Sequence, residues 1–447
     1  MADASTFHRL SRALASAFLA TDYSRDALTA AAQGVLQSKG RRVAALVSTA
    51  LIPERAYPPT QKHLARFIRS APIFPDVVLD FQRRKLTVPL VLTPEHAAPL
   101  PPLAGLELPR LTSPAELADW LEVPSRQLDW LADAQRRNAH AREPSLHHYT
   151  LSWRTKRSGS HRLIESPKVQ LKNCQRRILR EILDKVPAHP AAHGFVKGRS
   201  CVTGAAPHAG EEIVVTADLK DFFLTVPVPR VYGIFRSLGY PSPIARLLTG
   251  LTSTVTPPPD IPSLPNGSAQ DRWQAHRYFA PHLPQGAPTS PALANLCAWR
   301  LDVRLRALAY SLDAAYTRYA DDLAFSGGDV LSKYVHRLLA AVRQVAADEG
   351  FRVNERKIRI MRRGRRQTVT GVVVNERVNG PRDEYDLLKA MLTNCVRHGP
   401  ASQNRDGHPR FWACLTGRVG WVATLNPARG NRLEQLLGAI EWPALKG

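Results

Sequence analysis

The sequence predicts an α+β fold, with helices packed on one face of an antiparallel sheet, from three observations. Residues 211–226, EEIVVTADLKDFFLTV, form a run rich in β-branched residues that includes an acidic strand end, which is typical of a buried strand. Residues 315–327, AYTRYADDLAFSG, predict a strand, a tight turn and a second strand. Residues 333–350, KYVHRLLAAVRQVAADEG, place apolar residues on one helical face and end at Gly350. The amphipathic helix must bury its apolar face, and the sheet offers the surface for it.

The N-terminal region is predicted to be a separate, mainly helical extension. Residues 1–95 combine alanine-rich helical patterns with a candidate strand at 86–92, LTVPLVL. Arg9 and Arg12 precede the apolar run ALASAFLA, an arrangement weakly similar to a signal peptide. The run is short and no clear cleavage site follows, so the pattern predicts an ordinary amphipathic helix.

A second unit is predicted to begin at Ser113, after a proline-rich segment. The letters SPAE supply a cap residue, a proline at the first helical position and a glutamate three residues after the cap. Residues 149–169 predict a basic hairpin around RSGS, and residues 171–186 predict a helix with basic residues off its apolar stripe. That basic face fits either a solvated surface or a phosphate-facing one. Residues 351–361 and 367–379 predict further strands.

The charge balance indicates a polyanionic partner. Lys and Arg outnumber Asp and Glu by 61 to 38, for a formal net charge of +23 over 447 residues. Such an excess is typical of proteins that bind nucleic acid, and less often of proteins that bind an anionic membrane surface. The alternative is a soluble protein that is basic without such a partner. No apolar run reaches the length of a transmembrane helix, so we expect no membrane partner. The five cysteines are far apart and form no C-x-x-C, so the sequence indicates neither a zinc site nor a disulfide framework and fits a cytoplasmic location.

The chemistry is concentrated in three carboxylates. Asp321 and Asp322 are adjacent at the predicted turn, where their repulsion needs a cation to offset it. Asp218 ends a predicted strand about a hundred residues earlier. Oxygen ligands without histidine or cysteine favour Mg²⁺ over zinc, and two Mg²⁺ ions about 4 Å apart can support an in-line phosphoryl displacement. A surface hairpin with a polar tip is the alternative for YADD by itself.

Seven segments follow one another along the chain: RLIESPKVQLKNCQRRIL, AHGFVKGRS, ADLKDFFLTV, LPQGAPTSPALANL, RYADDLAFSG, GFRVNERKIRIM and VTGVVVN. In this order they resemble the reverse transcriptases, and specifically the bacterial retron type. LPQGAPTSP together with YADD is the most specific pair, whereas the retron assignment depends on VTG, residues 369–371, and on GAAPH, residues 204–208. Retron enzymes typically have asparagine where this chain has Gly204, which leaves the RNA contact of that element open.

The resemblance implies a right-hand polymerase with fingers, palm and helical thumb, preceded by the N-terminal helical extension. It covers about residues 113–447, and no family is assigned to the N-terminal extension. The expected divisions are an extension of unknown role at 1–95, a linker at 96–112, N-terminal helices and fingers at 113–212, palm at 213–380 with a fingers insertion at about 240–283, and thumb at 381–447.

The resemblance also implies the catalytic roles. Asp218 and Asp321 would hold both metals, and Asp322 would complete the acidic cluster. Lys357, in NERK, matches the lysine proposed to protonate the leaving pyrophosphate. It lies in a dense basic run, so electrostatic binding of the nucleic-acid backbone is an equal alternative.

Five further residues match the family's nucleotide-binding positions. Phe223 corresponds to the aromatic ring that excludes a ribose 2′-hydroxyl, although a core aromatic would have the same sequence pattern. Gln285 would contact the incoming dNTP, and Gly286 would allow the backbone to approach the template–primer closely. The alternative is that this segment is a proline-rich turn. Arg162 and Lys168 would clamp the triphosphate, with ordinary surface charge as the alternative.

The remaining matches concern RNA. The residues expected to bind it are His208, Val369, Thr370, Gly371, Trp412, Arg418 and Trp421. Aromatic and arginine residues interleaved in the C-terminal region are typical of RNA binding, although the tryptophans would equally hold a helical thumb together.

The resemblance implies an RNA-directed DNA polymerase that makes branched RNA–DNA (msDNA) from a structured non-coding RNA, in anti-phage defence. Its expected partners are that RNA, its cDNA, dNTPs and an effector protein. Two alternatives remain: another bacterial reverse transcriptase, such as a group II intron maturase or a phage-defence polymerase, and an RNA-binding scaffold for a defence effector.

Overall fold

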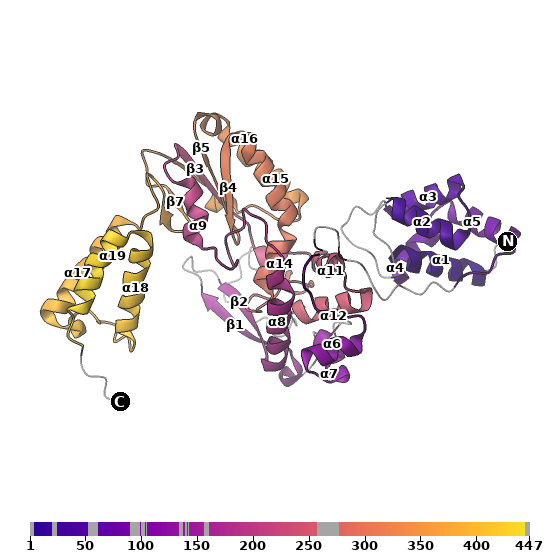
Figure 1. Ribbon diagram of the computed structural model, residues 1–447, viewed down its shortest axis with the longest axis horizontal. Coiled ribbons are helices and arrows are strands. Elements are labelled where there is room, and N and C mark those ends of the chain that lie inside the picture. Colours follow the sequence, from indigo (N-terminus) through magenta and orange to yellow (C-terminus); the bar gives the residue numbers. More distant parts are fainter. Residues whose placement is uncertain are drawn as a thin grey trace. The chain divides into compact units, whose positions relative to one another are not determined.

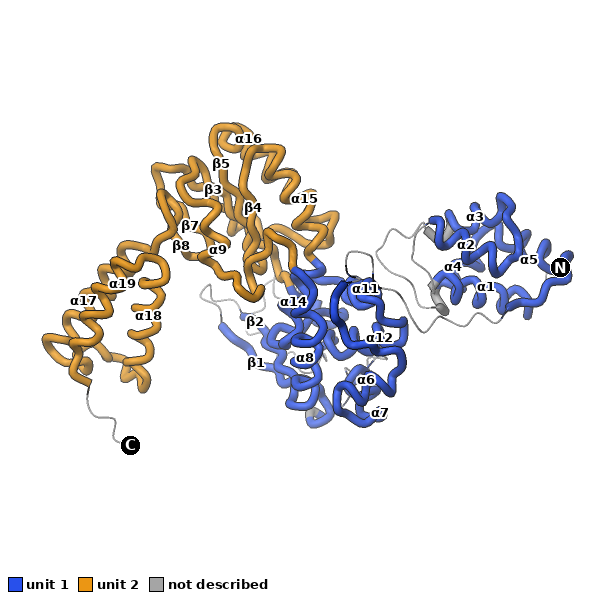
Figure 2. The backbone as a smooth tube through the Cα atoms, in the orientation of Figure 1, with its two compact units in different colours: residues 1–187, 223–297 blue, residues 188–222, 298–447 orange. Residues whose placement is uncertain are grey.

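The computed structural model divides into two compact units, which are described separately: residues 1–187 with 223–297, and residues 188–222 with 298–447 (Figure 2). The structure describes residues 4–19, 25–51, 61–89, 99, 103, 105–133, 137–138, 141, 143–155, 161–256 and 277–442. Several predicted segments lie at least partly outside that set. They are the linker at 96–112, of which most residues before 105 are outside, the tip of the predicted hairpin, part of the predicted fingers insertion and the last five residues. In the described residues, no helix is long and apolar enough to cross a membrane.

The described residues in the N-terminal part of the first unit form five helices. They are α1 (Ala4–Leu19), α2 (Arg25–Leu36), α3 (Arg41–Leu51), α4 (Gln61–Ser70) and α5 (Phe74–Arg83) (Figure 1). Their apolar faces form one core, with Leu14, Phe18 and Phe74 fully buried. The amphipathic helix at the N-terminus is confirmed as α1. The candidate strand at 86–92 is wrong for residues 86–89, which are irregular, and its other residues lie outside the described set.

In the rest of the first unit, the described residues form one hairpin, six helices and two short helical turns. Its elements are α6 (Pro114–Leu121), α7 (Ser125–Ala132), β1 (Tyr149–Thr155), β2 (His161–Pro167), α8 (Val169–Glu181), α11 (Val228–Ser237), α12 (Ser242–Thr252), α14 (Ser290–Cys297) and the short turns η3 (Pro144–Leu146) and η4 (Leu183–Lys185). The predicted cap is confirmed, because the Ser113 side chain accepts from the Glu116 amide at 3.2 Å. The Glu116 carboxylate bonds the amide of Thr112 rather than that of Ser113.

The second unit is built around a four-stranded antiparallel sheet, in the order β4, β5, β3, β6. The strands are β3 (Ile213–Asp218), β4 (Ala314–Tyr319), β5 (Asp322–Gly327) and β6 (Arg359–Arg362). Helices α15 (Trp299–Tyr310) and α16 (Asp329–Asp348) pack against each other and against this sheet (Figure 1). Leu338 and Val342 bury the predicted apolar stripe of α16. The predicted α+β fold class is therefore confirmed.

Shorter elements complete the second unit. They are α9 (Cys201–Ala205), η5 (Ala206–His208), α10 (Phe222–Thr225, at the boundary between the units), η7 (Glu355–Lys357), the two-stranded β7 (Thr368–Val369) and β8 (Val372–Val373), and η8 (Pro400–Ser402). The C-terminal helices α17 (Arg382–His398), α18 (Phe411–Leu425) and α19 (Pro427–Gly438) share a core that includes Leu392, Leu415 and Leu433.

Candidate active site

The three carboxylates meet at one end of the sheet. Strand β4 ends at Tyr319 and β5 begins at Asp322, which leaves Ala320 and Asp321 as the turn. Asp218, the last residue of β3, is the register partner of Asp322. Because opposite residues of antiparallel strands are close neighbours, the pairing brings carboxylates from two distant segments together.

Burial and mutual repulsion both act on the carboxylates of this cluster. Although Asp322 is an exposed residue, partial desolvation of its carboxyl and repulsion from Asp321 and Asp218 raise its pKa to about 6. Asp218 is only 4% exposed, and its Oδ2 accepts from Nζ of Lys357 at 2.5 Å. Burial would lower the pKa of Lys357, but the hydrogen bond to Asp218 and the charges of the carboxylates outweigh it and raise the pKa.

These carboxylates suit Mg²⁺ in their chemistry but are not a preformed cage. In the described parts of the chain, no three histidine, cysteine or acidic side chains are already arranged to hold a metal. Oxygen donors at the open end of a sheet fit the way Mg²⁺ is usually bound, through one or two carboxylates, waters and substrate phosphates. Burial and repulsion from Asp321 and Asp218 together raise the pKa of Asp322, and a bound cation would offset that repulsion.

The turn that carries Asp321 has a strained backbone. Ala320 has a φ of +54°, in the left-handed region that non-glycine residues rarely adopt. A Cβ added to Gly194 would lie 2.5 Å from the Ala320 nitrogen, so only glycine allows this approach. Leu219 donates its amide to the Asp321 carbonyl at 2.8 Å. The surrounding chain thus holds the turn in its unusual shape.

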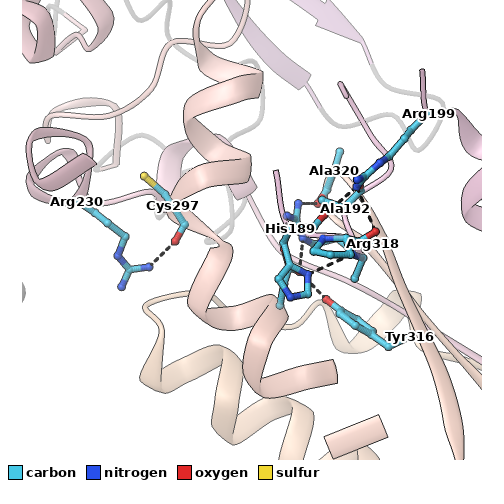
Figure 3. Close-up of polar contacts among 11 residues, drawn as sticks. His189, Ala192, Arg199, Arg230, Cys297, Tyr316, Arg318 and Ala320 are labelled. Atoms are coloured by element: carbon cyan, nitrogen blue, oxygen red, sulfur yellow. Dashed lines mark hydrogen bonds and ion pairs between the residues drawn. The ribbon is translucent and has the colours of Figure 1, made fainter. Parts of the chain in front are cut away.

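A fully buried ion pair lies directly behind the turn. Arg318 donates Nε and one terminal nitrogen to Asp302, at 2.8 and 2.6 Å, and both side chains are 0% exposed. The other terminal nitrogen donates to the Ala320 carbonyl at 2.9 Å (Figure 3). Tyr316 donates its hydroxyl to Asp302 at 2.9 Å. The guanidinium therefore joins helix α15 to the turn of the acidic hairpin.

The segment 189–199 hydrogen-bonds to strand β4 along the edge that does not pair with β5. Arg318 donates its amide to the Ala191 carbonyl at 2.7 Å, and His193 donates its amide back to the Arg318 carbonyl at 2.7 Å. One terminal nitrogen of Arg199 reaches the carbonyls of His189 and Ala192, at 2.8 and 2.6 Å (Figure 3). These bonds keep the segment in register with the hairpin.

A hollow of about 200 Å³ connects the carboxylates to the VTG residues. Its lining includes Asp218, Asp322, Lys357, Tyr319, Gly204 and residues 368–371. Thr370 and Gly371, with φ of +47° and +84°, form the turn between β7 and β8. The Oγ1 of Thr370 is buried without a hydrogen-bond partner in the described residues. Val369 is only 2% exposed, so any RNA contact here would come from the turn rather than from that side chain.

The predicted RNA contact of His208 needs correction, because its ring is 0% exposed. Its two ring nitrogens lie 2.7 Å from the hydroxyls of Ser326 and Thr317, on β5 and β4. Burial, with a smaller contribution from His193, lowers the pKa of His208 to about 4. The ring is therefore neutral and joins η5 to the sheet. The space beside Gly204 is also occupied by protein. A Cβ added to Gly204 would lie 3.2 Å from the His193 side chain.

The other predicted group lies in the first unit, around β2. Glu165 donates its amide to the Gln285 carbonyl at 2.7 Å. Gly286 has a φ of +129°, and its added Cβ would lie 3.0 Å from the Glu165 carbonyl oxygen. The structure thus holds the backbone of residues 285–286 directly against β2, the strand that carries Arg162.

A second buried ion pair supports this contact. His282 Nδ1 lies 2.7 Å from the Ala280 carbonyl, which can only accept, so Nδ1 carries a hydrogen. Nε2 lies 3.0 Å from Glu165 Oε2. Thr256 donates its hydroxyl to Glu165 Oε1 at 2.6 Å. Glu165 and His282 are 1% and 0% exposed as side chains, so the pair is fully desolvated.

Arg162 has a like-charged neighbour across the hairpin. It is the register partner of Arg154 on β1, and both residues are exposed. Like charges directly opposite are unfavourable unless an anion lies between them. Lys168 follows the end of β2, and its Nζ donates to the Ser145 carbonyl at 2.8 Å. It lines a different hollow, with Trp130 and His148.

The two phenylalanines of α10 differ in burial. Phe222 is 3% exposed, and its ring centroid lies 5.6 Å from that of Phe351, as expected of a core residue. Phe223 is half-buried. The difference favours Phe223 over Phe222 as the ring that a ligand could reach.

Both tryptophans predicted to bind RNA are on α18 and partly exposed. Trp412 is 55% and Trp421 is 38% exposed. Arg418 is half-buried and lies 3.8 Å from the sulfur of Met391. The core of the three C-terminal helices instead includes Leu415 and Val419, so neither tryptophan is one of its fully buried residues.

Sequence reasoning missed the residues that support the site. They are Arg154, Glu165, Gly194, His282, Asp302 and Arg318. Arg318 precedes YADD by one residue and Gly194 lies in a segment already matched to the family, so their positions were a usable signal. No sequence spacing indicates that Glu165 pairs with His282.

Comparison with known proteins shows a family match. Residues 154–382 match the model of the reverse transcriptase (RNA-dependent DNA polymerase) family. Retron Mx65 reverse transcriptase of Myxococcus xanthus is 42% identical over 66% of this chain and 66% of its own length, just under two thirds. Retron Mx162 reverse transcriptase of the same organism is 37% identical over 75% of this chain and 69% of its own length. Retron Ec86 reverse transcriptase of Escherichia coli is 34% identical over 63% of this chain and 77% of its own length.

Proposed function

Because the chain belongs to the reverse transcriptase family, and within it to the retron enzymes, we propose that it is an RNA-directed DNA polymerase that copies its own structured non-coding RNA. Synthesis starts from a guanosine 2′-hydroxyl of that RNA and leaves branched RNA–DNA (msDNA). The product and an effector protein act in anti-phage defence in the cytoplasm. The convergence of Asp218, Asp321 and Asp322 at the end of one sheet carries this proposal.

The residues of the second unit divide the chemistry among them. Asp218 and Asp321 would hold two Mg²⁺ ions, which activate the attacking hydroxyl and stabilise the leaving pyrophosphate when bound. Asp322 adds negative charge to the same cluster. The raised pKa of Lys357 keeps its ammonium group protonated, as a proton donor to pyrophosphate requires.

The residues around β2 would bind the dNTP. Arg162 and Lys168 supply positive charge for the triphosphate, and Gln285 contacts the nucleotide beside Gly286. Arg154, opposite Arg162, provides a second guanidinium, which explains why two like charges face each other.

The test of the proposed function is a segment exchange. Residues 368–447, which include the Thr370–Gly371 turn, Trp412 and Trp421, are replaced by the same region of a related retron enzyme. Extension of a generic annealed primer should stay within about tenfold, because the carboxylates lie outside the exchange. Self-primed synthesis should move from the native RNA to the donor's RNA, as gel analysis of products on both RNAs would show.

Two results would contradict this proposal in different ways. Continued use of the native RNA by the chimera would place recognition outside residues 368–447. Absence of any extension by the parent enzyme on either template, with RNA binding intact, would favour the RNA-binding scaffold instead.

Phe223→Val is expected to allow ribonucleotide incorporation, because a smaller side chain leaves room for the 2′-hydroxyl. Primer extension with ribonucleotides alone measures it. Phe222→Val is the matched control: the same substitution in the buried neighbour should lower stability, by a few kcal/mol for a truncated core ring, without changing sugar discrimination. Unchanged discrimination in the Phe223 variant would make that ring a structural residue.

Glu165→Gln is expected to raise the KM for dNTP, with a smaller change in kcat. The amide keeps the size of the side chain but replaces one of the two carboxylate oxygens that contact Thr256 and His282 with an NH2 group, so the backbone that presents Gln285 loses part of its buried anchor. A loss of about tenfold to a hundredfold in kcat/KM is the expected effect of such misplacement. Glu122→Gln removes an exposed partner of Arg177 and should leave both constants unchanged. Equal losses in kcat and kcat/KM would argue against a positioning role.

A further inference from the structure

The N-terminal helices α1–α5 have no role assigned by the family match, which begins at residue 154. They form a bundle with its own core. Three helix ends converge on one side of it: the end of α2, the start of α3 and the end of α5. The side chains at these three helix ends indicate a binding surface.

Two arginines and one aspartate fix the three helix ends. Arg84 donates to the carbonyls of Leu36 and Gln37, at 3.1 and 2.5 Å, and so caps the end of α2. Asp80 lies 3.3 Å from Arg42 and 3.8 Å from Arg84. This network holds the three helix ends in a defined arrangement.

The surrounding residues carry an unbalanced positive charge. The basic end, as we call it, consists of Lys39, Arg41, Arg42, Arg83, Arg84 and Lys85, all of them exposed. Asp80 pairs with two of these cations. In the described part of the chain, the other four have no carboxylate within ion-pair distance. The positive end of the α3 dipole adds to the same field. Folding gains nothing from gathering like charges, so the arrangement favours a polyanionic ligand.

The shape and composition of the basic end decide which polyanion it fits. A hollow of about 300 Å³ lies there, lined by Leu36, Ser38, Gly40, Arg41, Arg42, Val43, Val77, Asp80 and Phe81. The described residues of the bundle include no large apolar side chain that is exposed. A membrane surface or a protein interface would need apolar anchors, and single-stranded RNA would need aromatic rings for stacking. Double-stranded RNA is bound through phosphates and 2′-hydroxyls without either feature.

We propose that the basic end binds the phosphate backbone of a double-stranded RNA stem. The contact is independent of base sequence and adds affinity to whatever RNA the rest of the chain selects. It does not depend on polymerase activity, so its test is separate from that of the proposed function.

The experiment uses the full-length chain with four substitutions at the basic end: Lys39→Gln, Arg41→Gln, Arg83→Gln and Lys85→Gln. Arg42 and Arg84 are kept, because they hold the helix ends. The matched control removes the same charge from exposed residues elsewhere on the bundle: Arg9→Gln, Arg12→Gln, Arg25→Gln and Arg66→Gln. Thermal unfolding verifies that each variant is folded.

Fluorescence anisotropy with a 20-base-pair RNA hairpin, between 50 and 300 mM salt, gives Kd and its salt dependence. Neutralising four phosphate contacts should reduce the slope of log K against log salt by about three, and weaken binding about tenfold or more at the low-salt end. The control should change the slope by less than one. Binding of a single-stranded RNA of equal charge should fall less than that of the hairpin, and extension of an annealed DNA primer at saturating template should not change.

Three results would overturn the proposal. Equal losses in both variants would show that net charge alone matters. Unchanged binding in the first variant would show that the basic end contacts no RNA. Loss of binding to vesicles that contain anionic lipid, with hairpin binding intact, would assign the surface to a membrane.

Discussion

Asp321→Asn is expected to reduce cDNA synthesis about a thousandfold or more, because loss of one metal-ligand charge removes several kcal/mol of transition-state stabilisation. The substitution keeps the size of the side chain in the turn between β4 and β5. RNA affinity should stay near that of the parent, since binding depends on the basic surfaces. Primer extension and RNA binding are measured on the same purified protein at several Mg²⁺ concentrations.

The chain offers a matched control at the opposite end of the same strand. Asp313 precedes β4, is exposed and has a positive φ of +49°, so Asp313→Asn makes the same chemical change in a turn far from the carboxylate cluster. It should leave synthesis unchanged. Near-normal synthesis by the Asp321 variant, or an equal loss in both, would overturn the assignment of Asp321 as a metal ligand.

Arg318→Met should destabilise the fold and slow the chemistry together. Asp302 would become a buried, unpaired carboxylate, which typically costs about 3–5 kcal/mol of unfolding free energy. The Ala320 carbonyl would also lose the donor that lies 2.9 Å away, so the strained turn would lose one of its constraints. Denaturant unfolding and single-turnover extension measure the two effects.

A double variant separates these effects. Asp302→Asn combined with Arg318→Met removes both charges, and the amide oxygen can still accept from Tyr316. Replacing a buried ion pair with neutral groups often restores stability. We expect unfolding free energy to recover largely, while extension stays about tenfold to a hundredfold below that of the parent, because the turn is still not held. Full recovery of both would show that Arg318 supports the fold without positioning the turn.

Local patterns determined the secondary structure well. The β4–β5 hairpin, the helix α16 and the cap at Ser113 were predicted because the information for each lies within about twenty residues. The prediction of a strand at 86–92 was wrong for residues 86–89, which are irregular. An apolar run becomes a strand only where the tertiary structure supplies a second strand to pair with it.

The candidate carboxylates could be named from the sequence because Asp218 and Asp322 lie at strand ends and Asp321 lies in the turn beside Asp322. Their convergence depends on β3 pairing with β5, across more than a hundred residues. His208 shows the opposite case. Its motif suggested an RNA contact, but the neutral ring lies under the sheet, bonded to Ser326 and Thr317.

The sequence by itself determined the reverse transcriptase family, the α+β class and the acidic hairpin, because these depend on local spacing and on motifs in order. Only the tertiary structure decided what holds the hairpin and strand β2 in place. Arg318 meets Asp302, and Glu165 meets His282, from positions that no periodicity relates. A buried charge must find its partner wherever the chain brings one, and that partner is a property of packing rather than of sequence distance.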